Sequence, residues 1–369
     1  MLRSGKRLSK VVVVGAGLIG MLTARELVNA GLEVTLLDKS LAGTESSWAG
    51  GGILSPLYPW RYPEPVLQLA DIGHEVYESL AQSLQAESGF DPEWTRSGLL
   101  ILDENEAANA KQWSSCSGIS CEELALPLLK EIEPSLADVY QQALWLPDVA
   151  QIRNPRLIKT VKQSILSLGV KLIEDVEVEK VMFDSGVVTG VKTLDEIVPA
   201  DKVVITGGAW SAGLLPSVAT EIKVAPVRGQ MILFKTKPGL INRIILSQGR
   251  YLIPRRDGHV LMGSTMENVG FDKSTTVEAM NELKAAAYEI VPELVNCDIV
   301  KHWSGLRPGS PTGVPYIGEH PDISGLFVNV GHFRNGVILA PASCKLLVDL
   351  MLSRSTDLDP LPFSLKTAH

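Results

Sequence analysis

Length, composition and charge define the broad class of this chain. Its 369 residues are 45% hydrophobic, which is enough apolar surface for the cores of two domains. The formal net charge of -8 and the pI near 5.4 argue against nucleic acid or an anionic membrane as a partner, because phosphate binding depends on clustered Lys and Arg. We therefore expect a soluble globular protein with a small-molecule partner.

Cysteine and histidine usage excludes several other classes. The four cysteines show no C-x-x-C spacing and the six histidines are scattered, so we expect no metal site and no disulfide framework. This usage suits the reducing cytoplasm, where we expect the protein. Basic residues followed by VVVVGAGLIGML resemble a secretory signal, but the glycines in this run and the strand pattern after it favour another explanation. No stretch reaches the roughly 18 uncharged apolar residues of a membrane-spanning helix.

The first fifty residues carry the pattern of a strand, a turn, a helix and a second strand. Residues 11–14 (VVVV) are typical of a strand buried on both faces of a parallel sheet. Residues 18–30 show helical periodicity and stop at Gly31, and residues 32–38 form a second strand that ends in Asp38. This order opens a doubly wound α/β domain.

Three glycines between the first strand and the helix indicate what this element binds. Gly15 permits the tight turn, Gly17 lets the backbone approach a pyrophosphate, and Gly20 lets the helix pack on the strand. Asp38 can accept hydrogen bonds from a ribose hydroxyl. The element predicts a dinucleotide site and does not distinguish FAD from NAD.

A second glycine-rich segment follows at residues 43–65 (GTESSWAGGGILSPLYPWRYPEP). Residues 50–52 are consecutive glycines that allow the chain to lie flat against a planar ligand, and Ser46 and Ser47 can donate hydrogen bonds to phosphate or ribose. The alternative is a flexible surface loop. Ile53 and Leu54 suggest burial and favour the binding interpretation.

The remaining chain alternates between two kinds of pattern. Helices are expected near 65–90 and 155–169, buried strands near 203–206 and 325–331, and many short strands between 220 and 310. We predict a discontinuous Rossmann-like nucleotide-binding domain and a mainly antiparallel sheet domain with helices that binds substrate. The predicted boundaries are 1–80, 150–215 and 325–369 for the first domain, and 81–149 and 216–324 for the second.

Arg334 stands out in the segment GHFRNG, residues 331–336. It precedes the apolar run VILAPASCKLLVDLM, which is typical of a buried helix. The N-terminus of a helix already carries partial positive charge and favours anions. The sequence therefore predicts that a negatively charged group binds beside Arg334.

Several stretches together resemble one family. VVVVGAGLIG with Asp38, SSWAGGGIL, ITGGAWS, YLIPR, LMGSTME, WSGLRPGSPTGVPYIG and GHFRNGVILAPA are similar to the D-amino acid oxidase family of flavoproteins, most closely its glycine oxidases of thiamine biosynthesis. The resemblance implies non-covalent FAD and oxidative deamination of glycine, or another small amino acid or amine, to the imine. It also implies that O2 is reduced to hydrogen peroxide, that iminoglycine can serve thiazole synthesis, and that the chain forms a homo-oligomer.

The resemblance assigns residues to these roles. Arg307 matches the arginine that binds the substrate carboxylate, Arg334 matches its neighbour at the flavin, and Tyr251 matches the hydroxyl that completes the carboxylate clamp. The expected FAD contacts, besides the three turn glycines, are Leu18, Ile19, Asp38, Lys39, Ser46, Ser47, Gly51, Gly52, Ile53, Val178, His332, Phe333, Arg334, Asn335, Gly336, Val337 and Ile338. Hydride would pass from the α-carbon to flavin N5 without a general base, so the protein orients and stabilises charge.

Alternatives remain open at this point. Arg307 can instead pin the loop before Pro308, and Tyr251 can be a half-buried packing residue of an alternating strand. Ile53 stands where several glycine oxidases carry Met, and the following SPLYPWRYP is bulkier than in some members, which leaves the substrate undecided. A related dehydrogenase that passes electrons to a quinone, and a flavin-binding protein without turnover, are the competing functions.

Overall fold

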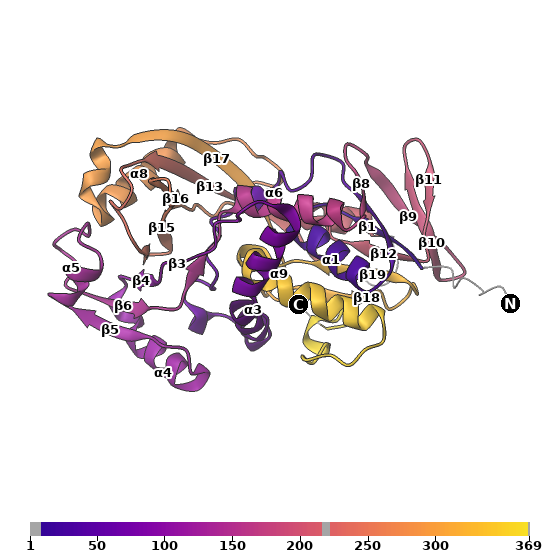
Figure 1. Ribbon diagram of the computed structural model, residues 1–369, viewed down its shortest axis with the longest axis horizontal. Helices are drawn as coiled ribbons and strands as arrows, with labels where there is room; N and C mark the ends of the chain where they lie inside the picture. The colour runs from indigo at the N-terminus through magenta and orange to yellow at the C-terminus, as the bar shows by residue number, and fades with distance from the viewer. Residues whose placement is uncertain (1–8, 216–221, 368–369) are drawn as a thin grey trace.

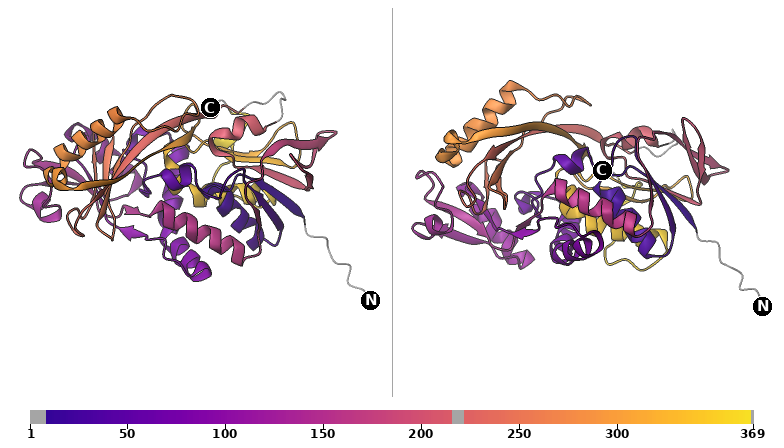
Figure 2. Two further views of the ribbon diagram at one scale, coloured as in Figure 1. Left: turned by 90° about the horizontal axis from the view of Figure 1, so that it is seen from above. Right: turned by 45° about the horizontal axis from the view of Figure 1, so that its top comes forward.

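The computed structural model describes residues 9–215 and 222–367 as an elongated molecule with two main sheets (Figure 1). Residues 1–8, 216–221 and 368–369, which fall within the predicted domain ranges, lie outside the described residues. In Figure 1 the helices α1, α3 and α9 occupy the centre, between a sheet domain on the left and strands β8 to β11 on the right. Figure 2 shows the same separation from two other directions.

A six-stranded sheet organises the first half of the molecule. Its strand order is β18 (Tyr316–Glu319), β19 (Leu326–Val330), β12 (Lys202–Ile205), β1 (Lys10–Val14), β2 (Glu33–Leu37) and β8 (Lys171–Ile173). All neighbours pair in parallel except β18, which runs antiparallel to β19. Residues 11–14 of β1 are buried on both faces of the sheet, so the predicted Rossmann-like topology is confirmed.

Helices cover one face of this sheet and a small sheet covers the other. The helices α1 (Leu18–Asn29), α3 (Glu64–Ser88), α6 (Asn154–Ser167) and α9 (Gly336–Met351) pack against one another. The opposite face is buried under β9 (Val178–Asp184), β10 (Val187–Thr193) and β11 (Ile197–Pro199). The two faces have separate apolar cores, and the carboxyl ends of the strands remain available for a ligand.

An eight-stranded sheet forms the second half. Its order is β17 (Asp298–Gly309), β13 (Ala225–Lys235), β16 (His259–Gly263), β15 (Arg250–Pro254), β14 (Ile244–Ser247), β4 (Leu99–Ile101), β6 (Gln142–Leu146) and β5 (Glu122–Ala125). Every pairing is antiparallel except that of β14 with β4. Helix α8 (Val277–Ile290) packs on β13 and β16, with α4 (Ala107–Ser117) and α5 (Leu128–Ile132) near β5. The predicted mainly antiparallel sheet with helices is confirmed.

Short elements connect these layers. They are α2 (Ser46–Ala49), α7 (Ser211–Leu214), a ribbon of β3 (Thr95–Arg96) with β7 (Ala150–Gln151), and 3-10 turns at Pro59–Arg61, Glu104–Glu106, Gly208–Trp210, Pro292–Asn296, Phe333–Asn335 and Leu361–Phe363. None of the helices within residues 9–215 and 222–367 is long and apolar enough to cross a membrane.

Two elements, helix α3 and the β18–β19 hairpin, extend across the domain boundaries that the sequence predicts. Helix α3 continues to Ser88 and packs along its length with α9 and α6, beyond the boundary at residue 80. Strand β18 belongs to the six-stranded sheet although it precedes residue 325. We propose that the nucleotide-binding domain includes α3 to Ser88 and the β18–β19 hairpin from Tyr316.

Candidate functional site

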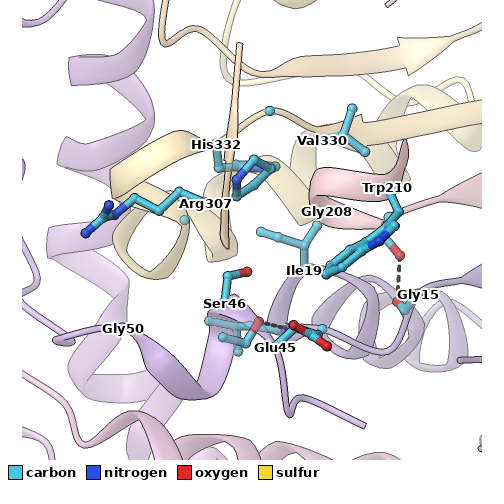
Figure 3. Close-up of a pocket in the computed structure, with 18 of the residues that line it drawn as sticks. Gly15, Ile19, Glu45, Ser46, Gly50, Gly208, Trp210, Arg307, Val330 and His332 are labelled. Atoms are coloured by element: carbon cyan, nitrogen blue, oxygen red, sulfur yellow. Dashed lines mark hydrogen bonds between the residues drawn. The ribbon is translucent and has the colours of Figure 1, made fainter. Parts of the chain in front are cut away.

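A cavity of about 430 Å³ lies where the two main sheets meet. Its lining includes the carboxyl ends of β1, β2 and β19, the start of α9, and residues of β13, β15 and β17 from the eight-stranded sheet. In Figure 3, Arg307 lies toward one end of this cavity, whereas Gly15 and Trp210 lie toward the other.

The structure brings nearly all the predicted site residues to this one cavity. Gly20 is the exception. The lining residues among those predicted are Gly15, Gly17, Leu18, Ile19, Asp38, Lys39, Ser46, Ser47, Gly51, Gly52, Ile53, Val178, Tyr251, Arg307, His332, Phe333, Arg334, Asn335, Gly336, Val337 and Ile338. They come from distant parts of the chain, so their convergence is a property of the fold.

The glycine turn after β1 leaves no room for side chains. Gly15 has φ +107°, and a Cβ there would lie 2.6 Å from the carbonyl oxygen of Thr206. A Cβ at Gly20 would lie 1.8 Å from the carbonyl oxygen of Gly15, so α1 packs directly on the turn. The Thr206 hydroxyl donates to that same Gly15 oxygen at 2.7 Å. Gly20 thus shapes the cavity from behind without lining it.

Asp38 and Ser47 fix the geometry of this turn. Asp38 accepts hydrogen bonds from the N–H of Ala16 at 2.6 Å and from that of Ser40 at 2.9 Å. Burial raises the pKa of Asp38, and these two backbone donors oppose the rise. Ser47 Oγ accepts from the N–H of Leu18 at 2.9 Å, so its own hydroxyl hydrogen is available for a ligand.

The second glycine segment lies close to the Tyr251 ring and to the carbonyl oxygen of Ile152. A Cβ at Gly51 would lie 3.1 Å from Cε2 of Tyr251, and one at Gly52 would lie 2.0 Å from the carbonyl oxygen of Ile152. Within the described residues, the N–H groups of Gly51, Gly52 and Ile53 have no hydrogen-bond acceptor. Three consecutive unsatisfied donors beside a cavity are suited to the polar edge of a ligand.

The segment before α9 contains the residues of GHFRNG. His332 is buried, its Nε2 lies 3.1 Å from Ser343 Oγ, and burial lowers its pKa to about 3, so the ring is neutral. Phe333 has φ +48°, an unfavourable conformation for a bulky side chain. The side chain of Arg334 has no hydrogen-bond or ion-pair partner among the described residues, and with Gly336 it lines the cavity at the N-terminus of α9. The binding of an anion beside Arg334 stays a prediction, and the lack of a side-chain partner among the described residues is consistent with it.

Arg307 lies in a shaped recess of the eight-stranded sheet. Its Nη2 donates to Ser264 Oγ at 2.7 Å and its Nη1 to the carbonyl oxygen of Thr265 at 3.2 Å. A Cβ at Gly229 would lie 2.1 Å from Nη2, so only glycine leaves space for the guanidinium. No carboxylate of the described residues pairs with Arg307.

Tyr251 and Arg334 complete the electrostatics around Arg307. Burial lowers the pKa of Arg307, a hydrogen bond and the proximity of Tyr251 raise it, and the like charge of Arg334 lowers it. The Tyr251 ring is buried between two glycines, because a Cβ at Gly263 would lie 2.8 Å from its Cε2. This end of the cavity therefore has two cations and one hydroxyl, and can bind a small carboxylate.

The other end of the cavity includes residues that sequence reasoning missed. Lys39 Nζ lies over the Trp210 ring, 4.2 Å from its centroid, and the ring centroids of Trp210 and Phe271 are 5.5 Å apart. Glu45, which also lines the cavity, pairs with Lys273 at 2.9 Å. Only the match of ITGGAWS to a family pointed near Trp210, since a tryptophan after a glycine turn has no local signal of binding.

The comparisons with known proteins agree with this geometry. A family model described as FAD dependent oxidoreductase matches residues 10–350. A protein of Pseudomonas aeruginosa named glycine oxidase is 47% identical over 96% of this chain and 98% of its own length. A bifunctional protein ThiO/ThiG of Synechocystis is 30% identical over 94% of this chain and 52% of its own length.

The fold of a solved relative matches along the whole chain. The crystal structure of glycine oxidase from Geobacillus kaustophilus has a TM-score of 0.92 and 30% identity, and the match covers 98% of this chain and 99% of that one. The two-sheet architecture, the cavity between the sheets and the family match lead to one conclusion. This chain belongs to the family of FAD-dependent oxidoreductases of the D-amino acid oxidase type.

Proposed function

We propose that this protein is an oxidase that converts glycine, or another small amino acid or amine, to the imine while reducing O2 to hydrogen peroxide. One observation carries the proposal: Arg307 is an enclosed cation that pairs with no carboxylate of residues 9–215 and 222–367, at one end of a cavity whose other features suit FAD. Two of the relatives compared above are named glycine oxidase.

The residues that line the cavity fit FAD. We assign the turn from Gly15 to Ile19 to the pyrophosphate, because Gly15 and Gly17 carry no side chain and the turn opens the N-terminus of α1. Asp38 keeps lone pairs for a ribose hydroxyl, and the unsatisfied N–H groups from Gly51 to Ile53 suit the ring. When bound, FAD supplies the hydride acceptor and passes the electrons to O2.

The chain's own residues orient the substrate. In the proposed complex, the guanidinium of Arg307 and the hydroxyl of Tyr251 bind the carboxylate, and Arg334 adds positive charge. These contacts direct the α-carbon toward the ring, and orientation of this kind can contribute a large part of the rate enhancement. Burial lowers the pKa of His332 to about 3, which makes it a weak base, and its Nε2 is already bonded to Ser343. We therefore propose that no base acts here and that the substrate amine reacts in its neutral form.

The physiological role that we propose is supply of iminoglycine for the thiazole ring of thiamine, in the cytoplasm. The support is the bifunctional ThiO/ThiG relative, in which a region similar to this chain makes up about half of the protein. An imine reacts readily with water, so a second enzyme that consumes it has to act quickly.

The test is an anaerobic half-reaction. The FAD-loaded protein is mixed with glycine, sarcosine, D-alanine or ethylamine, and the visible flavin absorption is recorded before and after oxygen is admitted. We expect glycine to bleach the flavin, and oxygen to restore the absorption with one hydrogen peroxide per turnover. Bleaching that oxygen does not reverse, but a quinone does, would instead show a dehydrogenase. A flavin that none of the four compounds bleaches would refute the proposed substrate class.

A further inference from the structure

Arg255 is a buried cation behind the second glycine segment. It follows β15, the strand that carries Tyr251, and the residue is 9% exposed. Nη2 donates to the carbonyl oxygen of Gly51 at 2.6 Å, and Nη1 donates to Gln151 Oε1 at 2.7 Å and to the carbonyl oxygen of Ile152 at 3.2 Å. All three acceptors are uncharged, which is unusual for a buried guanidinium.

The surrounding charges do not neutralise Arg255. Arg153 pairs with Glu93 at 3.0 Å and with Asp257 at 2.7 Å, and Arg156 pairs with the same Glu93 at 2.6 Å. Three arginines thus share two carboxylates. Burial and the nearby Arg153 lower the pKa of Arg255 to about 10, which Glu93 and Asp257 partly oppose. Arg255 therefore keeps its proton at neutral pH, and the cluster has one net positive charge.

Arg255 lies on the opposite side of the Gly51–Gly52 peptide from the cofactor cavity. Gly51 and Gly52 line that cavity, whereas Arg255 and Gln151 line a separate hollow of about 190 Å³. The Gly51 carbonyl thus points away from the cofactor cavity. In a trans peptide the following N–H points the opposite way, so the N–H of Gly52 is directed at the cavity. It has no acceptor within the described residues.

We propose that Arg255 is a positioning residue for the flavin, which fixes the Gly51–Gly52 peptide against the ring and favours the reduced form through its positive charge. The proposal rests on the proposed placement of FAD beside residues 51–53. A cation on the carbonyl polarises the peptide and strengthens its N–H as a donor. A reduced flavin carries more negative charge than an oxidised one, so both effects stabilise reduction.

Two substitutions separate charge from geometry. Gln151→Glu gives Arg255 a carboxylate at the same position and cancels its net charge without leaving a hole, and the Ser97 hydroxyl, now 2.9 Å from Gln151 Nε2, can reverse its hydrogen bond. Arg255→Lys keeps the charge and loses the planar fork. Arg256→Gln is the control, because Arg256 is half-exposed and binds Asp91 and Thr95 instead.

The readout is the midpoint potential of the bound flavin, measured by equilibration with a reference dye in the absence of substrate. We expect Gln151→Glu to shift the ratio of reduced to oxidised flavin about tenfold toward the oxidised form, which is about 30 mV for a two-electron couple. Arg255→Lys should shift it less, and Arg256→Gln should leave it unchanged. An unchanged potential in Gln151→Glu, or an equal shift in Arg256→Gln, would overturn the proposal.

The experiment distinguishes this inference from the proposed function. Dye reduction needs no amino acid, so the potential can be measured even if glycine is not the substrate. If wild-type protein binds no FAD, the proposed function and this inference both fail. If it binds FAD with the expected potentials but glycine does not bleach it, only the substrate assignment fails. If Gln151→Glu does not retain FAD, the comparison is between Arg255→Lys and Arg256→Gln. A lower flavin midpoint potential in Arg255→Lys supports the proposal, and equal potentials in these two variants refute it.

Discussion

The two walls of the cavity are built in different ways. The wall on the side of the six-stranded sheet uses backbone groups and glycines, such as Gly15 and the residues 51–53, and Gly20 lets α1 pack directly behind it. The wall from the eight-stranded sheet uses side chains, above all Arg307 and Tyr251. A backbone wall is sensitive to added atoms, whereas a side-chain wall is sensitive to removed atoms. The predictions below test this difference, from the largest expected effect to the smallest.

Gly20→Ala should damage the backbone wall most. The added Cβ would lie 1.8 Å from the carbonyl oxygen of Gly15, and neither backbone segment can rotate away as a side chain can. We expect destabilisation of about 3 kcal/mol or more and loss of most bound FAD. The measurements are the thermal midpoint and the FAD content of the purified protein.

Gly31→Ala is the matched control for this clash. Gly31 has φ +85°, but no atom lies within 4 Å of its added Cβ. The change should cost about 1–2 kcal/mol through backbone strain alone and leave FAD binding intact. If both variants lose FAD equally, direct packing of α1 on the turn is not what shapes the site.

Arg307→Gln should have the largest effect on the side-chain wall. Loss of the charged fork removes the counter-ion of the carboxylate, a loss of about 3 kcal/mol, or roughly 100-fold in the dissociation constant of glycine. FAD content should not change, because the turn and the residues 51–53 are untouched. Anaerobic titration of the flavin spectrum measures the affinity. Arg96→Gln, at an exposed arginine of β3, should bind glycine normally.

The buried His332 should make the stability of the folded protein sensitive to acid. Its pKa is about 3 when folded and about 6.5 when unfolded, so the unfolded chain binds more protons between these values. The free energy of unfolding therefore falls as pH decreases below about 6.5, by up to about 1.4 kcal/mol per pH unit, and by about 2 kcal/mol at pH 5.

His332→Asn should remove this slope and keep a partner for Ser343. Chemical denaturation from pH 5 to pH 8 measures it. His302, whose pKa burial also lowers, contributes equally to both proteins and cancels in the difference. Equal slopes in the two proteins would mean that folding does not change the pKa of His332.

Gly229→Ala tests whether the recess, as well as the arginine, binds the substrate. The Cβ would lie 2.1 Å from Arg307 Nη2, but the guanidinium is the end of a flexible side chain and can move. We expect glycine to bind about tenfold more weakly, since about 1.4 kcal/mol of a well-oriented contact is lost. In an Arg307→Gln background the same change should have almost no further effect on affinity. Additive losses would show that Gly229 acts independently of Arg307.

The two walls of the cavity also differ in how far the sequence predicts them. The turn from Gly15 to Gly20 and Asp38 could be predicted from residues alone, because strand, turn, helix and acid are contiguous and each glycine acts on its near neighbours. Arg307 required the family resemblance. Its recess is made by Gly229, Ser264 and Thr265, which other strands and loops bring together and which carry no local signal.

The same limit explains the domain boundaries. The motif WSGLRPGSPTGVPYIG runs without a change of composition from β17 in one sheet to β18 in the other, so its pairing partners cannot be read from it. The contacts of Arg255 could not be predicted either, because its partners Gly51 and Gln151 are distant along the chain. Contacts that depend on tertiary pairing are those that local patterns omit.

Tyr251→Phe should have the smallest effect and the most specific one. The ring is enclosed by Gly51 and Gly263 and should stay in place, so only the hydroxyl is lost. We expect kcat/KM for glycine to fall about fivefold, which is about 1 kcal/mol for one hydrogen bond. With ethylamine, which has no carboxylate, the same substitution should change kcat/KM little. A general weakening of the ring's packing would lower kcat/KM for both compounds alike. An equal loss with ethylamine would therefore mean that the Tyr251 hydroxyl does not bind the carboxylate. Arg307 would then be the contact on which carboxylate binding at the side-chain wall depends.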